Sequence, residues 1–298
     1  MLLVTGITGH SGTYFLQEMI DRKYEGSIRC IVRSSSNTSL IDNSELKIQK
    51  VIGDLNDWNF IDKSMIGVDT VLHIGAIYYS VKVMKAAVKN NVKRVILVHT
   101  TGIYSKYKSA SEEYKQIEAK IQQIVTGSRS PIGVTILRPT MIYGNINDRN
   151  MAVFIKMVDK LRLFPVIDHG NSLLQPVNAR DLGKAYYQVL TTSEIKCGDY
   201  ILSGEKPIMM LEMFKLISKN LNKKTCFISV PLGLGIFMAR CLKLCTLGKV
   251  DYVEKVKRMG EDRSFLHDKA TNDFGYNPMP FEDGIKVEVE QYKAMFKR

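Results

Sequence analysis

Short apolar runs alternate with longer amphipathic stretches along the first half of the chain. The apolar runs are rich in Val and Ile at consecutive rather than alternate positions, and they comprise Leu2–Thr5, Ile28–Val32, Ile48–Ile52, Thr70–Ile74, Arg94–His99 and Val134–Leu137. Such continuous runs are typical of strands that are covered on both faces, as in a parallel sheet. The stretches between them have the spacing of α-helices and include Gly12–Arg22, Val81–Asn90 and Ser111–Thr126. This order predicts an α/β fold with a doubly wound parallel sheet.

The second half of the chain mixes helical stretches with isolated strands and contains more Pro. Helical spacing is found in Phe154–Leu163, Met209–Leu221 and Leu232–Leu244. Their Met, Phe and Leu residues predict packing into the core of a lid over a substrate cleft. The last stretch also carries Arg240 and Lys243, so contact of this helix with a membrane surface remains open as an alternative.

The composition is that of a globular protein, with 45% hydrophobic and 24% charged residues among 298. The longest apolar stretch, Val230–Ala239, is shorter than the roughly 20 residues of a transmembrane helix. No basic leader precedes the first strand, and the cysteines are scattered, which favours free thiols in a reducing compartment over disulfides or a metal site. We therefore expect a cytoplasmic protein with neither a transmembrane segment nor a bound metal.

The chain is basic, because 42 Lys and Arg against 30 Asp and Glu give a net charge of +12. These residues are spread along the chain and no recognisable nucleic-acid module is visible. We therefore expect a small anionic or phosphorylated substrate, and no nucleic acid. The basic residues of the second half that could attract such a substrate are Lys215, Lys219, Lys223, Lys224, Arg240 and Lys257.

A glycine-rich turn follows the first predicted strand and opens the first predicted helix. Gly6 allows a sharp turn, Gly9 lets the backbone approach a pyrophosphate, and Gly12 lets helix and strand pack closely. The helix N-terminus adds free N–H groups and a partial positive charge for the phosphates. The turn therefore predicts a dinucleotide site with the candidate residues Gly6, Thr8, Gly9, His10, Ser11 and Gly12.

The Gly-x-x-Gly-x-x-Gly spacing resembles the short-chain dehydrogenase/reductase superfamily, in particular its extended or atypical branch, the NAD-dependent epimerase/dehydratase family. Further segments resemble the patterns of this family in the same order along nearly the whole chain, namely Gly53–Leu55, Val68–Ala76, Val92–Tyr104, Thr135–Gly144, Gln175–Leu182 and Leu266–Pro278. Each segment alone is a loose match, but the ordered set is specific.

This resemblance implies a Rossmann-type sheet with a smaller mixed α/β C-terminal region that binds substrate. We expect residues 1–145 to form the NAD(P)-binding domain, with residues 171–205 returning to its sheet. Residues 146–170 and 206–298 would form the substrate-binding lid, and a homodimer is a further expectation. The resemblance also implies cofactor contacts by Asp54 and Leu55 at the adenine, by Gly75 and Ala76 after the fourth strand, and by Pro139 beside the nicotinamide.

The end of the second predicted strand bears on the choice between NAD and NADP. An NAD site usually places Asp or Glu here to accept the ribose 2′-hydroxyl, whereas Arg accommodates a 2′-phosphate. This chain has Arg33 followed by Ser34 and Ser35, which favours NADP over NAD. The alternative is an exposed arginine at a strand end.

The resemblance further implies a catalytic Ser or Thr, Tyr and Lys. Thr100 occupies the hydroxyl position, and Tyr114 on the following helix is the best-placed tyrosine for proton transfer. Glu118 stands four residues on, where the lysine is expected. A carboxylate there would raise the pKa of Tyr114 above its ordinary value of about 10, so that the phenol acts mainly as a hydrogen-bond donor.

Two functions follow from these residues. One is an NAD(P)-dependent oxidoreductase, epimerase or dehydratase that acts on a nucleotide-sugar or another carbonyl or hydroxyl substrate, with Thr100 and Tyr114 at the reacting oxygen. The alternative is a non-catalytic NAD(P)-binding sensor or scaffold, because Glu118 replaces the lysine. His73 and His99 stand at strand ends, where we expect core or turn roles.

Overall fold

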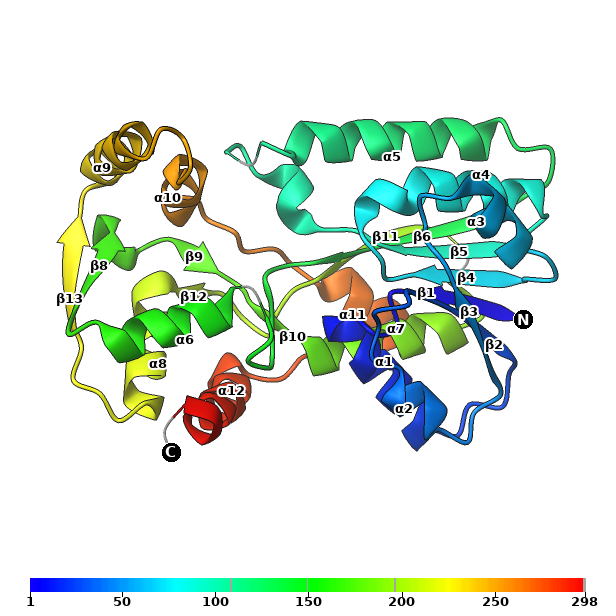
Figure 1. Ribbon diagram of the computed structural model, residues 1–298, viewed down its shortest axis with the longest axis horizontal. Helices are drawn as coiled ribbons and strands as arrows, with labels where there is room; N and C mark the ends of the chain where they lie inside the picture. Colours follow the sequence, from blue (N-terminus) through cyan, green and yellow to red (C-terminus); the bar gives the residue numbers. More distant parts are fainter. Residues whose placement is uncertain (108, 149, 196, 297–298) are drawn as a thin grey trace.

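The computed structural model describes residues 1–107, 109–148, 150–195 and 197–296. Its centre is a seven-stranded sheet in the order β11-β6-β5-β4-β1-β2-β3, in which all neighbouring strands are parallel (Figure 1). Its strands are β1 Leu2–Thr5, β2 Ile28–Val32, β3 Ile48–Ile52, β4 Thr70–His73, β5 Arg94–Val98, β6 Gly133–Pro139 and β11 Gly198–Leu202. The predicted doubly wound α/β fold is thereby confirmed.

Helices cover both faces of this sheet. Alternate side chains of each buried strand point to opposite faces, so each strand contributes side chains to two cores. Val4 of β1 and Leu72 of β4 lie in one core, and their neighbours Leu3 and Val71 lie in the other. The first core is covered by α1 His10–Asp21, α2 Ser39–Asp42, α7 Ala179–Thr191 and α11 Asp268–Phe274. The second is covered by α3 Trp58–Ser64, α4 Ser80–Lys89 and α5 Ser111–Thr126 (Figure 1).

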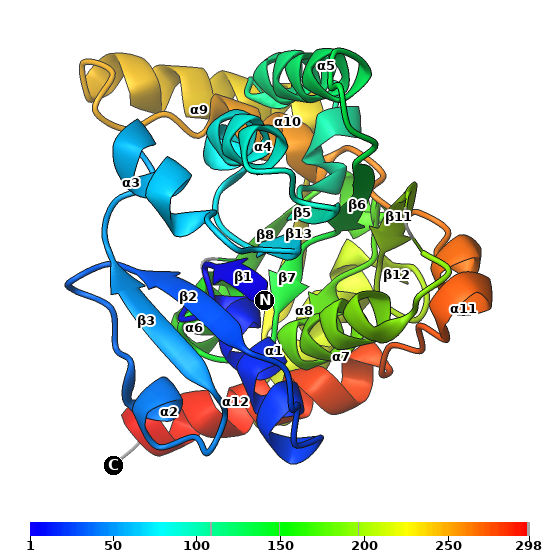
Figure 2. The same cartoon turned by 90° about the vertical axis from the view of Figure 1, so that its right-hand side faces the viewer.

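The remaining elements form a smaller lobe beside the carboxyl ends of the sheet strands (Figures 1 and 2). It contains three two-stranded sheets, which pair β7 Ile142–Tyr143 with β10 Val177–Asn178, β8 Leu163–Ile167 with β13 Cys226–Val230, and β9 Leu173–Leu174 with β12 Ile208–Met209. Its helices are α6 Met151–Lys160, α8 Met210–Asn220, α9 Leu232–Cys245, α10 Val253–Met259 and α12 Phe281–Phe296. A third core lies between α6, α8 and α12.

The smaller lobe differs from the sequence-based expectation in three places. The stretch Phe154–Leu163 is not one helix, because α6 ends at Lys160 and residue 163 already begins β8. The helix α11, expected in the lid, packs instead against β11 in the core of the main sheet. The apolar side chains of α9, expected in a core, are mostly exposed. Local spacing specifies a helix but does not specify which surface covers it.

Candidate active site

Two cavities lie at the carboxyl ends of the main sheet, and the first of them spans the position where the strand order reverses. That position lies between β1 and β4, because the chain runs outward from β1 through β2 and β3 before it returns to β4. Ligands of open α/β sheets bind in the crevice at such a reversal. One cavity lies over the ends of β1 to β4, and the other lies over the ends of β5 and β6.

The glycine turn forms the floor of the first cavity. Gly6 has φ +76°, a conformation that favours glycine, and the N–H of Gly9 donates to the carbonyl of Gly6 at 2.9 Å. A Cβ at Gly12 would lie 2.2 Å from that same carbonyl oxygen, so this glycine permits the close contact of strand and helix. Gly9 is exposed at the N-cap of α1, where its backbone faces the cavity.

The first cavity has a volume of about 330 Å³. It brings together eight of the residues predicted to bind the cofactor, namely Gly6, Thr8, Gly9, Arg33, Asp54, Leu55, Gly75 and Ala76. Its lining also includes Ser36 and Tyr79, which the sequence analysis did not single out. The backbone N–H of Arg33 donates to the hydroxyl oxygen of Ser36 at 3.2 Å, which holds the end of β2 in a tight turn. These residues suit a dinucleotide, with glycine backbone at the phosphates and a guanidinium at the ribose.

Five of the predicted cofactor residues do not line this cavity. Ser11 and Gly12 are buried in the first turn of α1, and Pro139 is buried at the end of β6. Ser34 is exposed beside the cavity, with Ser36 lining it instead. His10 opens α1 and lies near Tyr143, where burial lowers the pKa of its imidazole.

His73 fixes the wall of the cavity from inside the protein. Its Nε2 lies 3.2 Å from the carbonyl oxygen of Ala76, which can only accept, so this nitrogen carries the proton. Its Nδ1 then accepts from the Thr5 hydroxyl at 2.6 Å. Burial and the proximity of His99 lower the pKa of His73 to about 4, so the ring is neutral at pH 7. The expected core role of His73 is confirmed, because the residue is completely buried.

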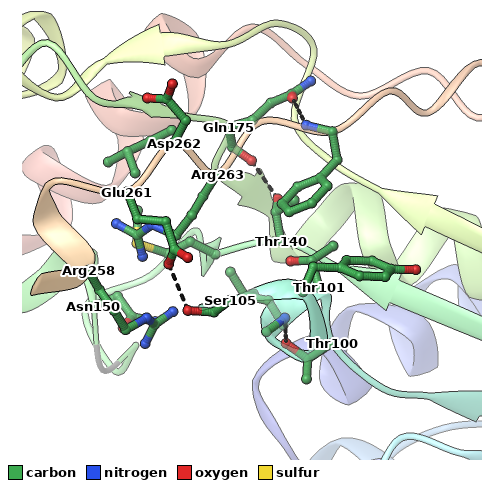
Figure 3. Close-up of a pocket in the computed structure, with 16 residues that line it drawn as sticks. Thr100, Thr101, Ser105, Thr140, Asn150, Gln175, Arg258, Glu261, Asp262 and Arg263 are labelled. Atoms are coloured by element: carbon green, nitrogen blue, oxygen red, sulfur yellow. Dashed lines mark hydrogen bonds between the residues drawn. The ribbon is translucent and has the colours of Figure 1, made fainter. Parts of the chain in front are cut away.

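The second cavity, of about 300 Å³, lies between the main sheet and the smaller lobe (Figure 3). From the main sheet it is lined by residues 100–105 after β5 and by residues 140–142 after β6. From the smaller lobe come the polar residues Asn150, Gln175, Arg258, Glu261, Asp262 and Arg263. The cavity thus has one wall from the strand ends of the main sheet and an opposite wall that is rich in charge.

Arg258 and Arg263 give this second wall its character. Among the residues that the structure describes, neither arginine Nε has a hydrogen-bond partner, although both atoms are buried. Burial and the nearby Arg258 lower the pKa of Arg263 to about 10, while Glu261 partly opposes this shift. Both Glu261 oxygens are already engaged, by the Ser105 hydroxyl and by the N–H of Lys106, each at 2.7 Å (Figure 3). Two guanidinium groups that repel each other and retain unpaired donors suit an anionic ligand such as a diphosphate.

The structure separates two of the predicted catalytic residues. Thr100 lines the second cavity, and its hydroxyl oxygen accepts from the N–H of Gly102 at 3.0 Å, which leaves its proton available to a ligand. Tyr114 belongs to α5, and its side chain lies in the core that α5 covers, with its hydroxyl oxygen 3.5 Å from that of Tyr78. Tyr114 is not among the described residues that line the two cavities.

The pKa of Tyr114 is raised to about 12, as expected in direction, but the cause differs from the expected one. Burial has the largest effect, followed by the hydrogen bond with Tyr78 and the nearby Glu113. Glu118 does not contribute, because its carboxylate is directed elsewhere. The expectation that Glu118 acts on Tyr114 was therefore wrong.

Glu118 belongs to an ionic group around the buried Arg138 that we call the Arg138 cluster, made of His99, Glu118, Arg138 and the exposed Asp199. Arg138 donates to the two Glu118 oxygens at 2.6 and 2.8 Å and also donates to Asp199. His99 Nδ1 adds a bond of 2.8 Å to Glu118. Burial opposes ionisation of Glu118, yet these hydrogen bonds hold its pKa at about 2. Glu118 thus ties α5 to β6 and to the residue after β5, and Arg138 extends the group to β11; Glu118 lines neither cavity.

The charged residues of the second cavity were not predicted from the sequence. The residues expected to attract an anionic substrate do not line this cavity as the structure describes it, namely Lys215, Lys219, Lys223, Lys224, Arg240 and Lys257. The segment 258–263 instead supplies two basic and two acidic residues in six positions. This high density of charged residues, which begins in the last turn of a short helix, was the feature of the sequence that could have identified them.

Comparison with known proteins supports this picture. A sequence model of the family described as NAD(P)H-binding matches residues 6–157. A curated protein of Escherichia coli O157:H7, "N-acetyl-alpha-D-glucosaminyl-diphospho-ditrans,octacis-undecaprenol 4-epimerase", is 22% identical over 222 residues, which cover 65% of this chain and 67% of that protein.

Two solved structures share the fold over nearly their whole length. MoeE5 in complex with UDP-glucuronic acid and NAD has a TM-score of 0.75 at 14% identity, and 99% of each chain is covered. Triphenylmethane reductase of Citrobacter sp. complexed with NADP(H) has a TM-score of 0.74 at 18% identity, covering 98% of this chain and 99% of that chain. At these identities the likeness shows a common fold.

Proposed function

This chain belongs to the NAD(P)H-binding family, and on that premise we propose that it is an NADP-dependent enzyme acting on a sugar carried by a diphosphate. Its oxidoreductase- or epimerase-like fold provides one cavity with a glycine turn and a second with unpaired guanidinium groups. The observation that carries the proposal is the pair Arg258 and Arg263, whose buried Nε atoms lie beside the Thr100 wall.

The cofactor part of the proposal depends on the fit of the first cavity. Gly9 carries no side chain at the N-cap of α1, so no side chain of this residue covers the helix N-terminus on the cavity side. Arg33 lines the cavity at the end of β2, where it would pair with a 2′-phosphate and so favour NADP. When bound, the nicotinamide would supply hydride transfer.

The substrate part depends on the second cavity. The two arginines would neutralise a diphosphate, and the Thr100 hydroxyl would donate to an oxygen of the attached sugar. UDP-glucuronic acid in MoeE5 and the diphospho-undecaprenol substrate of the Escherichia coli relative are both sugars joined to a diphosphate. We therefore propose a diphosphate-linked sugar as the substrate class, whether the other end is a nucleoside or a polyprenol.

A second candidate function is cofactor binding without turnover. It is favoured by the placement of Tyr114, whose phenol is buried with a pKa raised to about 12, and of Glu118, which occupies the predicted lysine position but pairs with Arg138. A protein of this kind would bind NADP(H) in the first cavity and leave the reacting groups of the second incomplete. The two candidates differ in turnover: the enzyme converts a substrate and depends on Thr100 to do so, whereas the sensor binds NADP(H) and converts nothing.

The test combines calorimetry with a substrate panel of UDP-sugars and polyprenyl-diphosphate sugars. Arg33→Ala should weaken NADPH binding about tenfold or more and leave the affinity for NADH unchanged, because a charge-assisted pair contributes about 1.5–3 kcal/mol.

Arg263→Ala should raise the KM for a diphosphate sugar, while the exposed Arg129→Ala should not. Thr100→Val should lower kcat with NADPH affinity intact.

The outcomes separate the candidates. NADPH binding without turnover of any panel member would support the sensor. Equal losses of NADPH and NADH in Arg33→Ala would show that Arg33 does not read the 2′-phosphate. An unchanged KM in Arg263→Ala would remove the diphosphate assignment.

A further inference from the structure

The helix α9 has an inner and an outer face, and both are apolar. Its inner face, where Gly235 and Ala239 are buried, packs on α10, and Gly235 faces Ile167 at the end of β8. A Cβ at Gly235 would lie 2.7 Å from Ile167 Cδ1 and 3.2 Å from Val256 Cγ1, so the contact on this side is close. Packing within the protein therefore accounts for the inner face only.

The outer face carries large apolar side chains into solvent. Phe237 is 63% exposed, Met238 is 58% exposed and Leu244 is 78% exposed. Leu234 and Leu242 on the same helix are 51% and 41% exposed, and Leu247 in the following turn is 88% exposed. Figure 1 shows α9 end-on at the side of the molecule remote from the N-terminus, and Figure 2 shows its length along the outer edge. We call Leu232–Gly248 the α9 surface.

Positive charge accompanies these side chains. Residues 231–250 contain Arg240, Lys243 and Lys249 and no acidic residue. The first acidic residue beyond them, Asp251, pairs with Lys243 at 2.7 Å and so offsets one of the three charges. Arg240 and Lys243 flank a shallow hollow that is otherwise lined by Leu244, Leu247 and Gly248. Cationic groups thus rim an apolar floor, which is the pattern of a surface that meets anionic headgroups and acyl chains.

We propose that the α9 surface docks on an anionic lipid bilayer, with α9 lying in the plane of the interface. A helix of 14 residues is about 21 Å long, which suits a position along the interface. Among the described residues, no helix is long and apolar enough to cross a membrane. Phe237, Met238 and Leu244 would enter the acyl boundary, and Arg240 and Lys249 would meet lipid phosphates.

The charges favour a bilayer over a second copy of this chain. In a two-fold symmetric dimer centred on α9, the same patch would face itself, so Arg240 near the middle of the helix would approach its own counterpart, and residues 231–250 contain no acidic residue to offset that charge. An anionic bilayer supplies the opposite charge at every point of contact, at roughly 1 kcal/mol per basic residue near the surface.

Docking would also place a particular part of the enzyme at the bilayer. The helix α10 packs on α9 and contributes Arg258 to the second cavity. Glu254 of α10 accepts from the Ser109 hydroxyl at 2.7 Å, so α10 is also tied to the segment that precedes α5. Arg258 of the second cavity would therefore lie on the helix directly behind the docked one. The docking proposal itself does not rest on the proposed catalysis.

The experiment is co-sedimentation of the full chain with vesicles of phosphatidylglycerol and phosphatidylcholine, or of phosphatidylcholine alone. The chain should sediment with the anionic vesicles, and the bound fraction should fall as salt is added. Phe237→Ser/Met238→Ser should lower the partition coefficient about tenfold or more. The matched control is Met295→Ser/Phe296→Ser, which removes the same two side-chain types from α12 at 60% and 57% exposure and should bind as the unmodified chain does.

A fluorescence measurement keeps the test independent of folding defects. The chain has one tryptophan, Trp58, so Trp58→Phe/Phe237→Trp places the sole indole on the α9 surface. Its emission should shift to the blue with anionic vesicles and be quenched by brominated lipid. An absence of sedimentation by the unmodified chain, or equal binding by the two serine variants, would overturn the proposal. So would self-association that is lost in Phe237→Ser/Met238→Ser without any vesicle binding, since the covering partner would then be a second copy.

Discussion

At the scale of single residues, the three glycines of the phosphate turn serve different purposes. Gly6 is required by its positive φ, and Gly12 by the 2.2 Å approach of a Cβ to the Gly6 carbonyl oxygen. Gly9 has φ −79°, which any residue adopts, and its Cβ would meet only that carbonyl, at 3.0 Å. Gly6 and Gly12 therefore maintain the fold, whereas Gly9 keeps space open for a ligand.

We therefore expect Gly9→Val to fold and to lose dinucleotide binding. The isopropyl group would occupy the approach to the α1 N-terminus, while the thermal midpoint would fall by only a few degrees. Calorimetric titration with NADPH and a thermal melt check the two parts. Gly233→Val, at a glycine with open space around it, is the control and should leave NADPH affinity unchanged. Full affinity in Gly9→Val would place the pyrophosphate elsewhere.

At the scale of secondary-structure elements, the Arg138 cluster joins the strand ends that support the second cavity. Arg138 stands on β6, Asp199 on β11 and Glu118 on α5, and His99 follows β5. The Arg138 side chain is only 4% exposed, so its charge depends on these carboxylates. A lysine in place of Glu118 would face Arg138 and His99, so this substitution would not restore a catalytic cation.

We expect Glu118→Gln to destabilise the protein by about 2–3 kcal/mol at pH 7, because Arg138 would keep only Asp199 as a charged partner. The folded-state pKa of Glu118 is about 2, below its ordinary value of 4.5. Its contribution is therefore fully present above pH 4.5 and is lost as the pH falls toward 2. Urea unfolding across this range should show the gap between the two proteins closing. Glu212→Gln, in an exposed pair with Lys215, should change the free energy of unfolding by less than about 0.5 kcal/mol.

The sequence predicted the elements of the main sheet because buried parallel strands carry continuous apolar runs. Leu2–Thr5, Ile28–Val32 and Ile48–Ile52 were predicted with their observed bounds. Most of the cofactor cavity followed, because its lining comes from the turns directly after these strands.

Most of the second cavity could not be predicted from the sequence, because its walls come from segments that are far apart along the chain. Arg258 and Arg263 meet Thr100 only through the arrangement of the smaller lobe, and no local period encodes that arrangement. Glu118 was correctly located on a helix, but its partner Arg138 lies 20 residues on, across a strand pairing that the sequence does not display. The exposure of α9 was missed for the same reason.

At the scale of the whole molecule, Glu288 links the C-terminal helix α12 to the segment that enters the smaller lobe. Its Oε2 accepts from the N–H of Gly144 at 2.8 Å, and the residue is completely buried. Burial and the neighbouring Asp148 raise the pKa of Glu288 to about 10, so the carboxyl is protonated at pH 7. A neutral acid thus ties the C-terminal helix α12 to the segment that follows β7.

We expect Glu288→Gln to stabilise the protein at neutral pH by about 1–3 kcal/mol, since the amide resembles the protonated carboxyl. The folded-state pKa is raised above the ordinary value of 4.5, so the contribution of Glu288 is complete below that pH and is lost as the pH rises toward 10. The advantage of the variant should therefore grow with pH in unfolding measurements. Glu290→Gln removes a charge from an exposed position of the same helix and is the control. A pH-independent difference would contradict a protonated Glu288.

The two cavities are also completed at different times when the chain is made. The lining of the first runs from Gly6 to Tyr79, and that of the second ends at Phe265, 186 residues later. At about 5–20 residues per second, translation separates these two points by roughly 9–37 seconds. During this interval the dinucleotide surface is synthesised while the arginine pair is still absent. The order of the linings along the chain therefore sets an order of biosynthesis, with the lining of the first cavity made first and that of the second cavity last.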